Sequence, residues 1–158
     1  MQQNEKKTER HSGGCQCGKL RYSFKGQLGK ASICHCRMCQ KAFGSWGAAL
    51  IDMAIVDFAW TRGEPAVFRS SSIVSRGFCK DCGTPMFMRD DGDPDIEIAI
   101  GTLDNPNDIP ALSKQSAVES RLDWFMTMHK LREERMEDYR SPEELVRLRS
   151  LQHPDFDT

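Results

Sequence analysis

The chain has 158 residues, with 22 Lys and Arg against 23 Asp and Glu and a formal net charge of −1 at pH 7. This length suits one domain, and the balanced charge excludes the single-sign field that drives non-specific nucleic-acid binding. No apolar run approaches the ~20 residues needed to cross a bilayer, and residues 1–10 lack the apolar core of a secretion signal. We therefore expect a soluble, cytoplasmic protein with neither a nucleic-acid nor a membrane partner.

Alternation of apolar and polar residues predicts short strands along most of the chain. The clearest runs are Leu20, Tyr22 and Phe24, and then Ile96, Ile98 and Ile100. Shorter β-like runs lie at residues 47–51, 66–70, 73–78 and 85–88. The sequence thus predicts a mainly β fold with an antiparallel core and irregular connections.

A helix is predicted near the C-terminus. Ser141 offers a capping hydroxyl, Pro142 suits the first helical position and Glu144 the third, and three leucines follow at helical spacing. Residues 1–11 and 152–158 are expected to be frayed ends.

Cysteine is the unusual residue in this composition. Seven are present, all in three clusters: Cys15 and Cys17; Cys34, Cys36 and Cys39; Cys79 and Cys82. An odd number cannot close entirely into intramolecular disulfides, and structural disulfides are rare in a reducing cytosol. Buried structural cysteines scatter with the hydrophobic pattern. Clustered thiols can instead converge on one point, which is the arrangement that a metal ion needs.

Glycines follow two of these clusters. Gly18 comes directly after Cys17, and Gly83 directly after Cys82. Glycine can take positive φ and turn the backbone sharply around a bound ion. In such a turn, backbone N–H groups can point at the thiolate sulfurs.

Coordination number suggests how seven thiolates divide. A structural zinc ion takes four protein ligands, whereas a catalytic zinc ion takes three and keeps an open position. Cys34 and Cys36 share one face of an extended backbone, and a turn can bring Cys39 to the same ion, so the middle cluster supplies three ligands. The two outer pairs would then form a closed four-cysteine site, although Cys15 and Cys17 could instead join the middle cluster.

Two alternatives concern the three-ligand site. His35 lies between two cysteines that share a face, so we expect its side chain to point to the opposite face and to pack rather than bind metal. All-thiolate sites are compatible with zinc or iron. Zinc is preferred, because the C-x-C spacing differs from the usual iron–sulfur cysteine runs.

Four motifs occur in order along the chain. They are GGCQCG followed by LRY within residues 13–22, CHCRMCQK at 34–41, FCKDCGTP at 78–85 and GTLD at 101–104. In their order and gaps these motifs resemble the glutathione-dependent formaldehyde-activating enzyme (GFA) family, also called the CENP-V/GFA domain. The resemblance accounts for every cysteine.

The resemblance implies a fold and a pair of metal sites. The fold is Mss4-like, with small coiled antiparallel sheets stapled by zinc and a short C-terminal helix. A CENP-V/GFA-type domain would span residues 12–140, between a tail at 1–11 and a C-terminal helix and tail at 141–158. The structural zinc ligands would be Cys15, Cys17, Cys79 and Cys82. The ligands of a second, catalytic zinc would be Cys34, Cys36 and Cys39.

The resemblance also implies an activity. Founding members of the family are regarded as carbon–sulfur lyases (S-(hydroxymethyl)glutathione synthases), which serve formaldehyde detoxification. This chain would join glutathione or a related thiol to formaldehyde or another small electrophile, with two zinc ions per chain and glutathione as co-substrate. The alternative is a non-catalytic, zinc-stabilised binding module of the same fold, which has no need of an open three-ligand site.

A glutathione site should contain cations, because glutathione carries two carboxylates. The candidates near the metal loop or on predicted strands are Arg21, Arg37, Lys41, Arg69 and Arg76. Each is also compatible with an ordinary surface charge. Phe43 and Trp46 could line the pocket or belong to the core, and Asp104 could orient a ligand or cap a turn.

Overall fold

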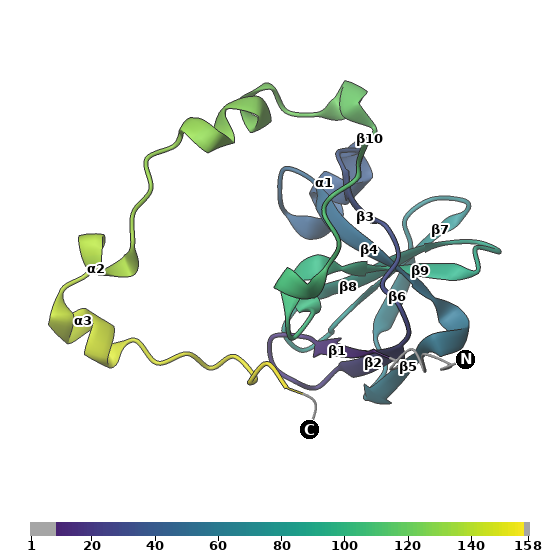
Figure 1. The fold of residues 1–158 in the computed structure, drawn as a ribbon, viewed down its shortest axis with the longest axis horizontal. Helices are drawn as coiled ribbons and strands as arrows, with labels where there is room; N and C mark the ends of the chain where they lie inside the picture. Colours follow the sequence, from purple (N-terminus) through teal and green to yellow (C-terminus); the bar gives the residue numbers. More distant parts are fainter. Residues whose placement is uncertain (1–8, 157–158) are drawn as a thin grey trace, which may run out of the picture.

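The computed structural model describes residues 9–156. They form ten strands in two sheets with few short helices, which confirms the predicted mainly β fold (Figure 1). The three-stranded sheet has the order β1-β2-β5, and the seven-stranded sheet has the order β10-β3-β4-β9-β8-β7-β6. Neighbouring strands are antiparallel except β10 and β3, which pair in parallel.

Six of these strands agree with the predicted runs, and four were not predicted. The bounds are β1 Arg10–Gly14, β2 Arg21–Lys25, β3 Ala31–Cys34, β4 Ala48–Ala54, β5 Phe58–Arg62, β6 Ala66–Arg69, β7 Val74–Phe78, β8 Pro85–Asp90, β9 Asp95–Ala99 and β10 Lys114–Ser116. The strands missing from the prediction are β1, β3, β5 and β10. Polar residues, glycines or cysteines obscure the apolar alternation in these segments.

The helices are short. They are α1 Arg37–Phe43, α2 Met136–Tyr139 and α3 Pro142–Arg147, with 3₁₀ segments at Ile55–Asp57, Ile100–Thr102, Pro106–Asp108, Val118–Ser120 and Asp123–Lys130. The predicted capping of α3 is present, because the Glu144 N–H donates to Ser141 Oγ at 3.2 Å and the Ser141 N–H donates to the Glu144 carboxylate at 2.9 Å. However, α3 ends at Arg147, before two of the three leucines that were expected to extend it.

The main core lies between the two sheets. Tyr22 and Phe24 of β2 pack with Ile51 of β4 and Ile98 of β9, and all four are fully buried or nearly so. The opposite face of the seven-stranded sheet carries a second, smaller apolar cluster, which includes Leu50 and the cysteines of the middle cluster. The seven-stranded sheet therefore packs the main core on one face and carries the middle cysteine cluster on the other.

The ends of the described chain are more ordered than expected. Residues 10 and 11 belong to β1, where they pair with Lys25 and Phe24, although the sequence placed them in a frayed tail. Near the other end, the His153 N–H donates to the Gln16 carbonyl at 2.8 Å. Residues 1–8 and 157–158 lie outside the described part of the chain.

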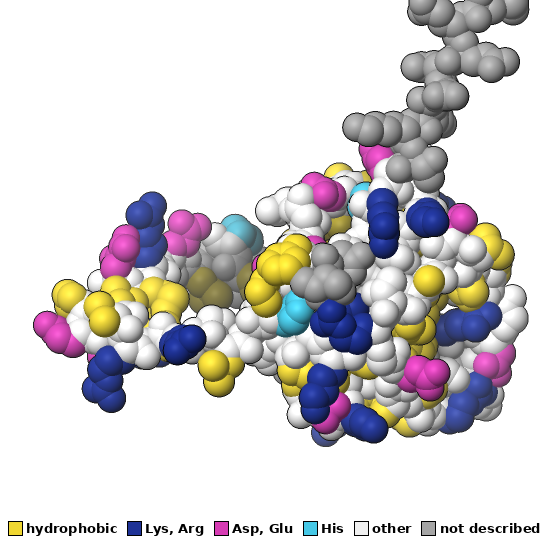
Figure 2. Space-filling model, turned by 90° about the horizontal axis from the view of Figure 1, so that it is seen from below, with side chains coloured by type: hydrophobic (Ala, Val, Ile, Leu, Met, Phe, Trp, Pro, Cys, Tyr) yellow, Lys and Arg dark blue, Asp and Glu magenta, His cyan; other side chains and the backbone are white. Residues whose placement is uncertain are grey.

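Between these anchors, the C-terminal segment leaves the sheets. Beyond β10 the chain forms an arc that carries α2 and α3 and returns beside the β1–β2 loop (Figure 1). On the face drawn in Figure 2, Lys and Arg side chains are mixed with Asp and Glu, in keeping with the balanced composition. None of the helices within residues 9–156 has the length and apolar character that a membrane span requires.

Candidate metal centres

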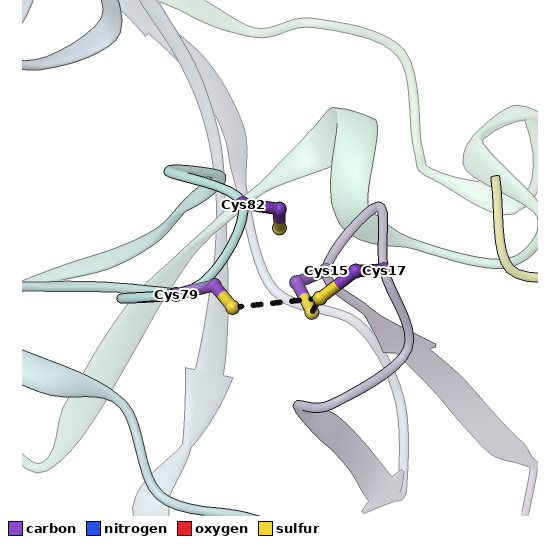
Figure 3. Close-up of side chains that lie close together, drawn as sticks. All are labelled: Cys15, Cys17, Cys79 and Cys82. Atoms are coloured by element: carbon purple, nitrogen blue, oxygen red, sulfur yellow. Dashed lines mark hydrogen bonds between the residues drawn. The ribbon is translucent and has the colours of Figure 1, made fainter. Parts of the chain in front are cut away.

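Four cysteines meet where the two sheets adjoin. The β1–β2 loop contributes Cys15 and Cys17, and the turn between β7 and β8 contributes Cys79 and Cys82 (Figure 3). Their four Sγ atoms lie within 4.8 Å of one another, and the Cys15–Cys17 and Cys17–Cys79 pairs are 3.5 and 3.8 Å apart. Tetrahedral coordination with Zn–S bonds of about 2.3 Å separates the sulfurs by roughly 3.8 Å. This four-cysteine cluster therefore fits a zinc ion.

The two turns have the predicted backbone geometry. Gly18 and Gly83 have φ values of 73° and 77°, in the left-handed region that glycine tolerates. The Leu20 N–H donates to Cys15 Sγ at 3.2 Å. Thr84, which the sequence did not single out, places its hydroxyl 3.1 Å from Cys82 Sγ. Burial alone would raise the pKa of Cys82, but the hydrogen bonds from Thr84 and from the backbone lower it to about 6.

The middle cluster is built on the junction between β3 and α1. Cys34 ends β3, Cys36 is the residue that caps α1, and Cys39 lies in the first turn of the helix. The Cys39 N–H donates to Cys36 Sγ at 3.3 Å, so a thiol serves as the helix cap. The expected turn after Cys36 is thus the first turn of a helix, which ends at Gly44 with φ of 57°.

This three-cysteine cluster has one ligand fewer than the four-cysteine cluster. The Sγ atoms of Cys34, Cys36 and Cys39 lie within 4.8 Å of one another, and no fourth His, Cys, Asp or Glu of the described chain joins them. The pKa of Cys34 is lowered to about 5, chiefly by its hydrogen bond with Cys39. All seven cysteines are free thiols.

His35 packs away from the cluster, as predicted. It is fully buried, and its Nε2 lies 2.9 Å from Oε1 of Gln115 in β10. Its ring meets the edge of Phe125 at a centroid distance of 4.7 Å and also contacts Trp46. These contacts attach the segment after β10 to the metal loop, and Trp46 belongs to this aromatic group.

The five candidate cations have different partners in the structure. Arg76 reaches the three-cysteine cluster, where Nη2 donates to Cys39 Sγ at 3.3 Å. Arg21 pairs with Asp104 at 2.5 Å, and Arg69 pairs with Asp91 at 2.6 Å, so both are committed elsewhere. Asp104 therefore anchors Arg21.

The last two cations line a groove along α1. Arg37 and Lys41 lie with Trp46 and Trp124 around an open space of about 550 Å³. Arg37 Nη1 donates to Gln40 Oε1 at 2.9 Å, which holds the guanidinium against the helix. The groove follows the same helix that carries Cys39. Phe43 packs against the three-cysteine cluster.

A further acidic residue shares the sheet face of the three-cysteine cluster. Glu97 in β9 lies directly opposite Asp52 in β4 and Met88 in β8, and Met88 Sδ is 4.0 Å from Cys39 Sγ. Burial raises the pKa of Glu97 to about 7, helped by the negative charges of Asp52, Asp90 and Cys34.

We expect this carboxyl to make stability depend on pH. Because the folded pKa of about 7 exceeds the unfolded value near 4.3, the folded state binds more protons between these values. The contribution of Glu97 to the free energy of unfolding should therefore fall as pH rises from 5 to 7. Urea unfolding of zinc-saturated protein between pH 5 and 8 would measure this loss. Comparison with Glu97→Gln isolates the effect of this group, and an unchanged pH profile in the variant would contradict the assignment.

Comparisons with known proteins were consistent with this architecture. A family model described as "Glutathione-dependent formaldehyde-activating enzyme" matches residues 10–118, more than half of the chain. A crystal structure of a Rhodobacter sphaeroides protein superposes with a TM-score of 0.54 at 20% identity, covering 66% of this chain and 99% of that one. At this identity the likeness bears on the fold alone. No curated protein matches the chain.

Proposed function

The chain belongs to the glutathione-dependent formaldehyde-activating enzyme family, and on that basis we propose that it is a zinc-dependent carbon–sulfur lyase. It joins glutathione or a related thiol to formaldehyde or another small electrophile. The two cysteine clusters would each hold one zinc ion.

The observation that carries the proposal is that the two clusters differ in their number of thiols. Four thiols converge in one and three in the other within the described chain. Four ligands close a tetrahedral zinc site, whereas three protein ligands leave one position for a substrate. The four-cysteine cluster would serve the fold, and the three-cysteine cluster would serve the reaction.

The proposed reaction is an addition that needs no oxidant or reductant. The thiol sulfur forms a bond to the carbonyl carbon, the π electron pair moves to the oxygen, and the proton lost by the thiol ends on that oxygen. Zinc at Cys34, Cys36 and Cys39 would supply a position that favours the thiolate form of the incoming thiol near neutral pH.

The chain's own residues support binding of an anionic thiol in the groove along α1, the helix that carries Cys39. Arg37 and Lys41 offer positive charge for the carboxylates of glutathione, and the aromatic rings of Trp46 and Trp124 line the same groove. All four side chains lie on or near α1, the helix that begins after Cys36.

The test is NMR of formaldehyde with glutathione, with and without the protein. We expect the zinc-loaded protein to accelerate formation of the hydroxymethyl thioether beyond the spontaneous rate. Cys36→Ala should abolish the acceleration, because it removes one of the three ligands and leaves the four-cysteine cluster intact.

Zinc content provides the control for this comparison. The Cys36→Ala protein should remain soluble and hold about one zinc ion per chain rather than two. No acceleration by the fully zinc-loaded protein would remove the formaldehyde reaction and favour the binding-module alternative.

A further inference from the structure

A buried arginine lies against the three-cysteine cluster. Arg76 in β7 is 3% exposed, and no carboxylate of the described chain pairs with it. An unpaired charge in a protein interior is costly, and a guanidinium does not lose its proton. Its environment must therefore supply negative charge from another source.

The contacts of Arg76 identify that source. Nη2 donates to Cys39 Sγ at 3.3 Å, and Nε donates to Ser70 Oγ at 3.0 Å. Nη1 is buried and has no hydrogen-bond partner among the described residues. Met88 lies opposite Arg76 in the β7–β8 ladder and also touches Cys39, so strand register fixes the guanidinium beside this sulfur.

The net charge of a metal-bound three-cysteine cluster explains why a cation lies beside Cys39. Three thiolates around a divalent ion leave a net charge of −1, and the neighbouring Cys39 is fully buried. The four-cysteine cluster carries a larger excess, but Cys17 there is exposed, so water can screen its charge. Cys39 is shielded from water, so the negative charge of a metal-bound cluster there would need a cation from the protein itself, and Arg76 is the cation that contacts Cys39.

We propose that Arg76 is a positioning residue that balances the charge of the three-cysteine metal site and orients Cys39 within it. The proposal depends on the part of the proposed function that puts a metal ion at this cluster. It does not depend on the thiol reaction.

The test measures metal binding by the intact chain carrying Arg76→Met, a change that keeps much of the side-chain length and removes the charge. Competition with a chelator should show the three-cysteine site weakened about 10- to 100-fold, the usual effect of losing a group that supports a metal ligand. The four-cysteine site should keep its affinity. Arg76→Lys should recover much of the loss, because it restores the charge without the planar fork.

A spectroscopic measurement separates this role from a purely structural one. In protein loaded with cobalt(II), a hydrogen bond to a thiolate sulfur stabilises the sulfur electrons and raises the energy of the sulfur-to-cobalt charge-transfer band. Arg76→Met should therefore shift the band of the three-cysteine site to lower energy.

Arg69→Met is the matched control. Arg69 lies in the neighbouring strand β6 and pairs with Asp91 at the exposed surface, so its replacement should change neither the affinity nor the band.

Wild-type affinity and band position in Arg76→Met would overturn the proposal. So would a Lys variant as weak as the Met variant. If Arg76→Met fails to fold, Arg76→Lys still tests the proposal. The charge-transfer band of the Lys variant should shift from that of the wild type, while the three-cysteine site keeps most of its metal affinity. These measurements involve no glutathione or formaldehyde, so a failed activity assay would leave them intact.

Discussion

Replacing Cys82 with alanine is expected to give insoluble or zinc-poor protein. Cys82 and Cys79 lie in the β7–β8 turn of the seven-stranded sheet, whereas Cys15 and Cys17 lie in the loop that joins β1 to β2 of the smaller sheet. Zinc at this cluster would fasten the two sheets together across more than sixty residues of chain. Loss of one ligand removes the fastening.

The expected size of the effect follows from the energy of such sites. Structural zinc binding is worth roughly 10–16 kcal/mol, comparable to the whole stability of a domain, about 5–15 kcal/mol. A loss of this size equals or exceeds the whole stability that such a domain has. Soluble yield, zinc content and circular dichroism of Cys82→Ala would measure the result.

The matched control is Cys36→Ala in the other cluster. Its three cysteines come from one short segment, the end of β3 and the start of α1, so zinc there joins no distant parts of the chain. This variant should remain folded with about half of the zinc. Equal damage from the two substitutions would contradict the division between a structural and a reactive cluster.

Replacing Asp104 with alanine should lower the free energy of unfolding by about 3–5 kcal/mol, the usual result of removing one partner of a buried ion pair. The side chains of Arg21 and Asp104 are only 3% and 12% exposed, and two hydrogen bonds of 2.8 and 2.5 Å join them. Asp104 also accepts a hydrogen bond from Ser12 Oγ at 2.6 Å. Urea unfolding of zinc-saturated protein would measure the loss.

The double variant Arg21→Leu with Asp104→Leu is the control for this measurement. It removes both charges, so it should cost less than Asp104→Ala, which leaves a buried guanidinium without its carboxylate. A double variant that is less stable than the single one would contradict the explanation.

The same pair should affect stability at low pH. Burial would raise the pKa of the Asp104 carboxyl, but the hydrogen bonds from Arg21 and Ser12 lower it below its ordinary value. A lowered folded pKa stabilises the protein above the unfolded value near 4, and this stabilisation is lost as pH falls through the folded pKa.

Local sequence was sufficient to predict much of the fold and the grouping of the thiols. The strands β2 and β9 alternate apolar and polar residues clearly, and the capping residues of α3 are adjacent in the chain. The glycines after Cys17 and Cys82 signalled the turns that the structure shows. Such signals act within a few residues, so they can be read without knowing the rest of the chain.

Other features escaped prediction because their causes are not local. The helix α1 has only seven residues and uses a cysteine as its cap, so it lacks the usual capping signal. Strand β10 is recognisable only by its parallel pairing with β3, some eighty residues away. Spacing alone also left open whether Cys15 and Cys17 join the last pair or the middle cluster.

The sequence by itself determined that this is a mainly β protein and that its seven cysteines form clusters with the spacing of metal ligands. Periodicity and spacing are properties of neighbouring residues, so they can be read from the sequence. The tertiary structure decided which clusters meet and which of five candidate cations reaches a thiol. Arg76 is 37 residues from Cys39 in the chain, and only the register of β7 against β8 and the packing of α1 bring them together. Charge balance at a buried site depends on distance in space, which one-dimensional spacing does not specify.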